Sequence, residues 1–108
     1  MTCSFEQVIM QKGVYRMRET VVEKYLRKRC QENDFLCYKF VSPSNNGVPD
    51  RILIGHGMTL FVELKAPGQK PRELQNVVFE RMRAHGATVY VVDTKEGVDQ
   101  LLHDLLNP

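Results

Sequence analysis

Two apolar runs separated by a short connection constrain the fold of this chain more than any other feature. The run DRILI, residues 50–54, and the run TLFVEL, residues 59–64, are rich in β-branched and aromatic side chains, which favour strands. The connection contains His56-Gly57, and a two-residue loop with glycine is typical of a tight β-hairpin. We therefore predict an antiparallel hairpin in which Gly55 pairs with Met58 and the pairing continues outward from them.

This register brings charged residues together at the open end of the hairpin. Asp50 lies opposite Glu63 on one sheet face, and Lys65, two residues further on, points to the same face. Carboxylates directly opposite each other are destabilising unless a cation neutralises them. Either Lys65 bridges them on a solvated strand face, or a divalent cation such as Mg²⁺ binds them. The apolar residues on both faces of these strands indicate interior strands, and a polar cluster there favours a site.

The segments around the hairpin predict further helices and strands. Residues 18–31 carry apolar side chains at helical spacing, and residues 35–41 are rich in aromatic and β-prone residues, as in a strand. Residues 42–49 have the composition of a loop. After the hairpin, residues 71–85 predict a helix and residues 88–92 a short strand.

Two apolar stripes predict the buried faces of the later helices. Pro71 suits the first position of its helix, whose stripe consists of Leu74, Val77, Val78 and Met82. A last helix is predicted by Val98, Leu101, Leu102 and Leu105. The order of elements is then helix, three strands, helix, strand, helix, and a helical crossover joins parallel neighbours. We predict an α/β fold with a mixed central sheet flanked by helices.

The composition limits the class of protein. A chain of 108 residues with 43% hydrophobic residues is expected to form one globular domain. Its net charge of +2 neither demonstrates nor opposes a nucleic-acid partner. Three cysteines without a C-x-x-C pair indicate neither a disulfide framework nor a zinc site. No apolar run approaches the roughly 20 residues of a membrane helix, and these features together favour a cytoplasmic protein.

The sequence resembles the virus-type replication-repair nuclease (VRR-NUC) family of the PD-(D/E)XK nuclease superfamily. Pro49-Asp50 and Glu63-Leu64-Lys65 carry the resemblance, within the longer pattern GVPDRIL…FVELKAPGQKPRELQ…HGATVYVV. The resemblance is to the stand-alone form found in phages and bacteria, which implies a phage or bacterial host cytoplasm. It implies a nuclease domain over residues 17–108, with residues 1–16 as an N-terminal extension. The predicted order of elements agrees with the αβββαβ core of this family.

The resemblance implies a metal-dependent endonuclease site at the open end of the hairpin. Asp50, Glu63 and the main-chain carbonyl of Leu64 would hold Mg²⁺ or Mn²⁺, and two acidic ligands favour these ions over zinc. Lys65 would act beside the metal, on the attacking water or on the charge that develops on phosphate.

The family also uses a glutamate on its first helix, for which this chain offers Glu19 and Glu23. On a helical wheel Glu19 falls inside the apolar stripe, between Leu26 and Cys30, whereas Glu23 falls past its edge. We therefore interpret Glu19 as the catalytic acid and an additional candidate metal ligand, a helix N-terminal role being the alternative. Glu23 is expected to be an exposed partner of Arg27.

Further site residues are expected around this cluster. Gln75 matches a glutamine on the family's next helix and lies beside the predicted stripe, so we interpret it as a catalytic residue. An exposed helix glutamine is the alternative. Residues placed to contact DNA phosphate are Lys39, Ser42, Ser44, Lys70 and Arg72, although ordinary surface roles explain each of them as well.

The stand-alone family members imply a homodimer that cuts branched DNA, in particular four-way Holliday junctions. The last helix, or Phe5 and Val8 in the extension, are candidates for the dimer contact. Two other functions stay open. The first is a non-catalytic DNA-binding module of the same fold, against which the intact set Asp50, Glu63 and Lys65 argues. The second is a restriction or nicking nuclease on linear duplex, for which the chain shows no target-recognition segment.

Overall fold

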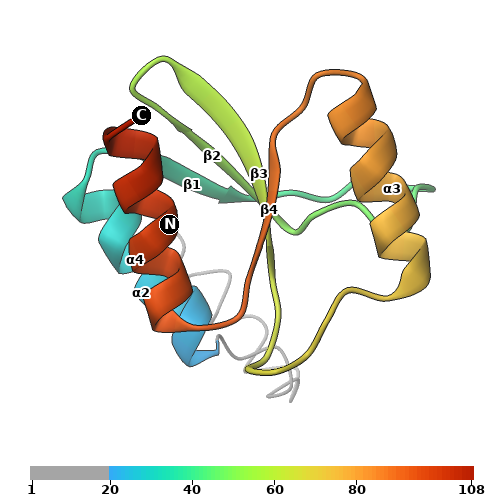
Figure 1. Ribbon diagram of the computed structural model, residues 1–108, viewed down its shortest axis with the longest axis horizontal. Coiled ribbons are helices and arrows are strands. Elements are labelled where there is room, and N and C mark those ends of the chain that lie inside the picture. Colours follow the sequence, from blue (N-terminus) through green and yellow to red (C-terminus); the bar gives the residue numbers. More distant parts are fainter. Residues whose placement is uncertain (1–19) are drawn as a thin grey trace.

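The computed structural model describes residues 20–108, so Glu19 and the extension with Phe5 and Val8 lie outside the described residues. The helices and strands follow the predicted order (Figure 1). They are α2 (Val21–Glu32), β1 (Leu36–Lys39), β2 (Arg51–Gly55), β3 (Met58–Leu64), α3 (Glu73–Ala84), β4 (Val89–Val92) and α4 (Lys95–Leu106). None of the helices within residues 20–108 is long and apolar enough to cross a membrane.

The strands form one mixed sheet in the order β1-β2-β3-β4. β1, β2 and β3 are antiparallel neighbours, whereas β4 returns parallel to β3 after the crossover through α3. Helices α2 and α4 lie together on one face of this sheet, and α3 lies on the other (Figure 1). The predicted α/β fold with a mixed central sheet is confirmed.

The central hairpin has the predicted register. Gly55 pairs with Met58, and the pairing continues to Arg51 opposite Val62. Antiparallel pairing extended by one position therefore reaches the two carboxylates at the open end of the hairpin. The register follows from the two-residue turn, because a tight turn leaves the flanking strands no freedom to slip.

The residues of the turn make this tight geometry attainable. His56 and Gly57 both have positive φ, 52° and 77°, as a type I′ turn requires. The His56 ring nitrogen Nε2 lies 2.7 Å from the backbone carbonyl oxygen of Asn33 and donates to it. Its ring also packs on Phe35 at 4.8 Å between centroids. His56 is therefore a structural residue.

The sheet face beneath α2 and α4 holds the hydrophobic core. The apolar stripes of both helices are buried there, which confirms the face predicted for α4. The main core residues are Val22, Leu26, Cys30, Leu53, Leu60, Val62, Val98, Leu101 and Leu102. The apolar stripe of α4 is thus buried in this core, and the dimer contact considered for the last helix stays a prediction.

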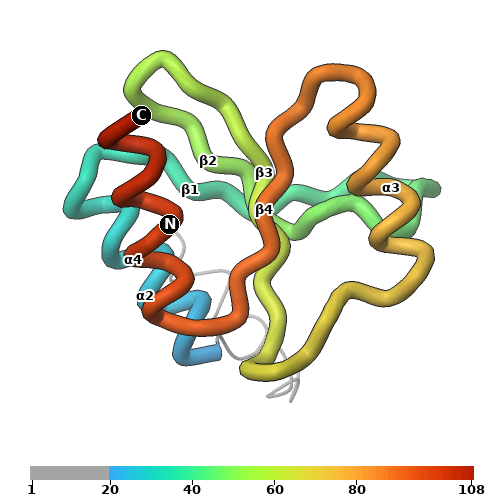
Figure 2. Tube along the Cα trace, in the orientation of Figure 1, coloured from blue at the N-terminus to red at the C-terminus, as the bar shows by residue number. Residues whose placement is uncertain are grey.

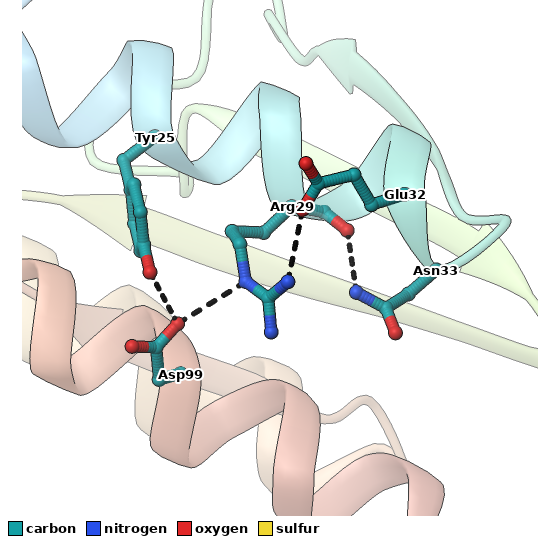
Figure 3. A network of polar contacts seen from close by, with 5 residues as sticks. All are labelled: Tyr25, Arg29, Glu32, Asn33 and Asp99. Carbon is teal, nitrogen blue, oxygen red and sulfur yellow. Dashed lines mark hydrogen bonds and ion pairs between the residues drawn. The ribbon is translucent and has the colours of Figure 1, made fainter.

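A polar network joins α2 to α4 outside the core (Figure 3). The Tyr25 hydroxyl donates to Asp99 at 2.8 Å, and Arg29 Nε donates to the same carboxylate oxygen at 3.2 Å. Arg29 also pairs with Glu32 at 2.9 Å, and the Asn33 amide caps the helix on the Arg29 carbonyl at 2.8 Å. Exposed pairs of this kind contribute about 0–1 kcal/mol each, so the network chiefly orients one helix on the other.

Helix α3 begins later than predicted. It starts at Glu73, so Pro71 precedes the helix and does not occupy its first position. The backbone N–H of Arg72 donates to Gln75 Oε1 at 3.0 Å. This side chain satisfies one of the donors that a helix start leaves unpaired, and so the helix begins after Arg72.

The buried face of α3 also differs from the predicted stripe. Leu74 and Val77 are 51% and 54% exposed, whereas Gln75 and Phe79 are buried. Gln75 is bonded to side chains of the sheet end, and Phe79 follows one turn later on the same helix face. The predicted stripe was wrong at Leu74 and Val77 because these bonds set the rotation of the helix.

The sheet face toward α3 is only partly covered. Ile52, Ile54 and Phe61 of the hairpin are half-buried there, and Leu36 and Tyr38 of the edge strand β1 are exposed. The expectation that both faces of the hairpin are interior therefore holds fully only beneath α2 and α4. A single helix cannot cover the whole face of a four-stranded sheet.

Candidate active site

The predicted charged residues meet where β2 begins and β3 ends. Lys65 Nζ lies 3.1 Å from Glu63 Oε2. Asp50 Oδ1 accepts a hydrogen bond from the backbone N–H of Leu64 at 3.2 Å, which holds the Asp50 carboxylate against the end of β3. The structure thus brings Asp50, Glu63 and Lys65 together, as the hairpin register predicts.

Gln75 connects this group to α3. Its Oε1 accepts hydrogen bonds from Lys65 Nζ at 2.8 Å and from the backbone N–H of Arg72 at 3.0 Å. Its Nε2 donates to Glu63 Oε2 at 3.1 Å. Gln75 therefore lies within the group, and the alternative of an exposed glutamine was wrong. We refer to Asp50, Glu63, Lys65 and Gln75 as the charged cluster.

The Glu63 carboxylate has the chemistry of a cation ligand. Glu63 is 5% exposed, and its Oε2 contacts both Lys65 and Gln75. Its Oε1 is buried and has no hydrogen-bond partner among residues 20–108. A buried polar atom without a partner costs about 1–3 kcal/mol, and more when it is charged. A divalent cation binds carboxylate oxygens directly, so Glu63 Oε1 is suited to be a metal ligand.

The pKa of Asp50 supports the same interpretation. Burial, together with the negative charge of Glu63, raises the pKa of Asp50 to about 6. The hydrogen bond from Leu64 and the positive charge of Arg51 oppose this rise only in part. A bound cation would stabilise the Asp50 carboxylate, whose negative charge is disfavoured by burial and by the nearby Glu63.

We expect Asp50→Asn to stabilise the metal-free protein at neutral pH. Because the folded-state pKa lies above the ordinary value of 3.8, the folded state binds more protons than the unfolded state between about pH 4 and 6. Stability that is present below this window is therefore lost as pH rises through it. At about pH 8 the substitution should raise the free energy of unfolding by about 1–2 kcal/mol, allowing for solvent screening. Thermal melts in EDTA should then shift upward by roughly 5–10 °C.

The matched control for this experiment is Glu80→Gln. Glu80 is an exposed carboxylate on α3 that pairs with Arg83 at 2.8 Å, so its loss should leave the pH dependence unchanged. Equal stability of Asp50→Asn and the unaltered protein from about pH 5 to 8 would contradict the assignment of a destabilised carboxylate.

Glu23 takes a structural role that differs from the predicted one. Its Oε1 accepts from the Thr20 backbone N–H at 2.9 Å, while its own N–H donates to Thr20 Oγ1 at 3.1 Å, forming a capping box. Its Oε2 lies 3.1 Å from the Arg51 guanidinium, with side chains 17% and 4% exposed. The prediction of an exposed Glu23 was therefore wrong, because Arg51 draws this carboxylate inward.

Sequence reasoning did not single out Arg51. The signal was present, because Arg51 alternates along β2 with the core residue Leu53, so its side chain points to the face beneath α2. A cation on a core-facing position requires a buried anion, and on the first helix Glu23 supplies it. The pair links α2 to the strand that begins next to Asp50.

The predicted DNA-contact residues lie in three different places. Lys39 of β1 lies directly opposite Arg51 of β2 in the strand register. The two side chains therefore share the sheet face beneath α2, which is the opposite face from the charged cluster. Lys70 and Arg72 are exposed in the segment that precedes α3. Ser42 and Ser44 are in the β1–β2 loop, and Ser42 lines a cavity beside α3.

The chain is similar to two known proteins over most of its length. "Putative nuclease p44" of Acyrthosiphon pisum secondary endosymbiont phage 1 is 41% identical over 81 residues, which cover 74% of this chain and 87% of the phage protein. A solved structure of a VRR_NUC domain superposes with a TM-score of 0.71 at 33% identity, covering 76% of this chain and 90% of that one. The chain belongs to the VRR-NUC family. No family model matches it, so the assignment rests on these two similarities.

The VRR-NUC fold is a nuclease fold, which implies a divalent metal ion. Among residues 20–108 no group of three or more His, Cys, Asp or Glu side chains is placed to hold such an ion. The charged cluster supplies two carboxylates. This is the number that Mg²⁺ commonly takes from a protein when water and substrate phosphate complete its shell. The donor set of the charged cluster thus fits a divalent metal ion that has further ligands from outside residues 20–108.

Proposed function

We propose that this VRR-NUC protein is a metal-dependent endonuclease that hydrolyses phosphodiester bonds in DNA. The observation that carries the proposal is the buried, unpartnered Glu63 Oε1 beside a second carboxylate and a lysine. The family and the similarity to a protein named as a nuclease support it. Buried polar atoms in native proteins are nearly always paired, so an unpaired buried carboxylate oxygen calls for a ligand as its explanation.

The carboxylates and one backbone oxygen are the proposed metal ligands. Asp50 and Glu63 would hold Mg²⁺ or Mn²⁺, which when bound supplies charge neutralisation of the phosphate and a lowered pKa of water. Leu64 N–H points toward Asp50, and the carbonyl of a strand residue faces the same neighbouring strand as its N–H. The main-chain carbonyl of Leu64 is therefore on the correct side to contribute.

Lys65 is the proposed group that acts on water or on the developing phosphate charge. Its ammonium has three N–H donors, and the structure assigns two of them, to Glu63 at 3.1 Å and to Gln75 at 2.8 Å. These two contacts fix the position of the nitrogen and leave one donor for a substrate oxygen. Gln75 thus acts by orienting Lys65 and Glu63 relative to each other.

Glu19 stays the proposed catalytic glutamate of the first helix and an additional proposed metal ligand. The contacts of Glu23 support this choice, because one of its carboxylate oxygens accepts from Thr20 and the other pairs with Arg51. The proposed catalytic set is therefore Glu19, Asp50, Glu63, Lys65 and Gln75.

We further propose a homodimer that prefers branched DNA such as a four-way junction. The substrate preference rests on the family resemblance, and a two-fold dimer would place two sites on two strands. The exposed apolar side chains Leu36 and Tyr38 on β1 offer a contact surface. Light scattering should give twice the mass of one chain, and Tyr38→Glu should halve it. A single-chain mass for the unaltered protein would contradict the dimer.

Cleavage of a matched panel of DNA substrates tests the function. Linear duplex, flapped duplex and a four-way junction of shared sequence are incubated with Mg²⁺, Mn²⁺ or EDTA. We expect endonucleolytic products from the branched substrates with either metal and none in EDTA, because the carboxylates act through the ion.

The other outcomes favour the other functions. Cleavage in EDTA would contradict the metal-dependent site. Cutting that prefers linear duplex would favour a restriction or nicking nuclease. Binding of all substrates without cutting would favour a non-catalytic module, and a salt-dependent affinity alone discriminates nothing because every phosphate contact produces it.

A further inference from the structure

A cavity of about 390 Å³ lies between the β1–β2 loop and helix α3. Figure 2 shows this loop extending from the sheet to the side of α3. The polar and cationic residues of its lining are Ser42, Asn45 and Asn46 from the loop, and Arg81 and His85 from the helix. None of the residues that line it within the described part of the chain is acidic.

Both walls of the cavity are connected along the chain to the charged cluster. The loop leads directly into Asp50, and α3 carries Gln75 in its first turn. Gly47 seats the loop on the helix: its φ is +91°, and a Cβ there would lie 3.1 Å from the Val78 side chain. At 1.5 Å per residue, Val78 is about 5 Å and His85 about 15 Å along α3 from Gln75. At about 3.4 Å per nucleotide, roughly one to four nucleotides of a strand cover this distance.

The helix wall presents an exposed positive charge. The Arg81 side chain is exposed and forms no hydrogen bond or ion pair with another residue in the range 20–108. His85 Nδ1 donates to the Arg81 carbonyl at 2.8 Å, which leaves Nε2 for a ligand. The neighbouring acid Glu80 is neutralised by Arg83. This wall suits an anion such as phosphate.

The loop adds a hydroxyl donor to the cavity, and three further lining residues add an apolar surface. Asn45 Nδ2 donates to Ser42 Oγ at 3.0 Å, so the Ser42 proton is free to donate to an anionic oxygen. The remaining lining residues Val48, Val78 and Met82 are half-buried and apolar. They provide a surface against which a sugar or base can pack.

We propose that this cavity binds an unpaired nucleotide adjacent to the scissile phosphate, with its phosphate on Arg81 and His85 and its base or sugar against Val78 and Met82. This inference deepens the proposed nuclease function and rests on it. The volume lies in the range of sites for single small ligands and is too small for a duplex. A base within a duplex is stacked on its neighbours and cannot reach the apolar residues that line the cavity. The cavity thus favours DNA in which a nucleotide next to the cut is unstacked, as at a branch point or a single-stranded overhang.

The first test compares two DNAs in EDTA, where binding is measured without cutting. Fluorescence anisotropy gives the affinity for a duplex with a single-stranded overhang and for the blunt duplex of the same sequence. Arg81→Ala should weaken binding of the overhang DNA about tenfold, as expected for a lost charged hydrogen bond, and binding of the blunt duplex less than about twofold. The matched control is Lys28→Ala, which removes the same charge from an exposed position on α2.

Two results of this comparison would overturn the proposal. One is equal weakening of both DNAs by Arg81→Ala, and the other is the same pattern for Lys28→Ala. Because Arg81 is exposed, its variant should keep the melting temperature of the unaltered protein, so loss of fold does not confuse the result.

The second test is independent of cleavage. Deoxythymidine 3′,5′-bisphosphate is titrated into isotope-labelled protein, and saturable amide shifts are expected at Ser42, Asn45 and Arg81, absent in Arg81→Ala. Unchanged amides there would overturn the cavity site even if the protein cuts DNA. If the amide shifts are saturable but the protein cuts no DNA, the nucleotide site is supported and only the nuclease function is overturned.

Discussion

Glu63→Gln is expected to lower the single-turnover rate of DNA cleavage by at least about a thousandfold, on the order of 4 kcal/mol in the activation free energy. The amide keeps the shape of the side chain and its contacts to Lys65 and Gln75. It loses the negative charge on the buried oxygen that has no partner in the described structure. Gel-resolved cleavage of a four-way junction, with enzyme and Mg²⁺ in excess, measures this rate.

Two companion variants make the result interpretable. Glu80→Gln is the same chemical change at an exposed position of α3 and should keep the rate within about twofold. Lys65→Ala should lower the rate about a hundredfold or more, because it removes the one positioned cation of the cluster. A Glu63→Gln protein that cuts within about tenfold of the unaltered enzyme would contradict the assigned site.

Arg51→Met is expected to lower the free energy of unfolding by about 3–5 kcal/mol. The guanidinium is almost fully buried and pairs with Glu23 at 3.1 Å. Its removal leaves a largely buried carboxylate with one oxygen unpaired, and breaking a buried pair from one side is strongly destabilising. Urea unfolding followed by circular dichroism gives the difference between the two proteins.

A double substitution separates charge burial from packing. Arg51→Met combined with Glu23→Met removes both charges, so most of the lost stability should return. Arg29→Met removes a partly exposed arginine that pairs with Asp99 and Glu32, and it should cost less than about 1 kcal/mol. An Arg51→Met cost as small as that of Arg29→Met would contradict the assigned role of the buried pair.

Local backbone geometry explains what the sequence predicted well. The two-residue turn at His56-Gly57 sets the hairpin register without help from the rest of the chain. Strand alternation then carries this register to the open end, where Asp50 meets Glu63. The order of elements and the buried stripe of α4 follow from spacing in the same way. These features depend on neighbours in sequence.

Helix α3 shows where spacing was insufficient. Leu74 and Val77 fit an apolar stripe as well as Phe79 does, so a helical wheel cannot decide which face of α3 is buried. The bonds from Gln75 to Glu63 and Lys65 decided the rotation, and they come from a strand that the helix meets only in the folded chain. The stripe of a helix identifies its buried face only when no polar anchor competes with it.

The sequence by itself determined the element order, the hairpin register and the position of the carboxylates and Lys65 at its end. Tertiary structure alone decided that Arg51 engages Glu23, that Gln75 anchors α3, and that the β1–β2 loop and α3 enclose a cationic cavity. The physical reason is the range of the interactions. Turn and strand geometry act between adjacent residues, whereas a buried ion pair, a helix rotation and a cavity exist only between segments that folding brings together.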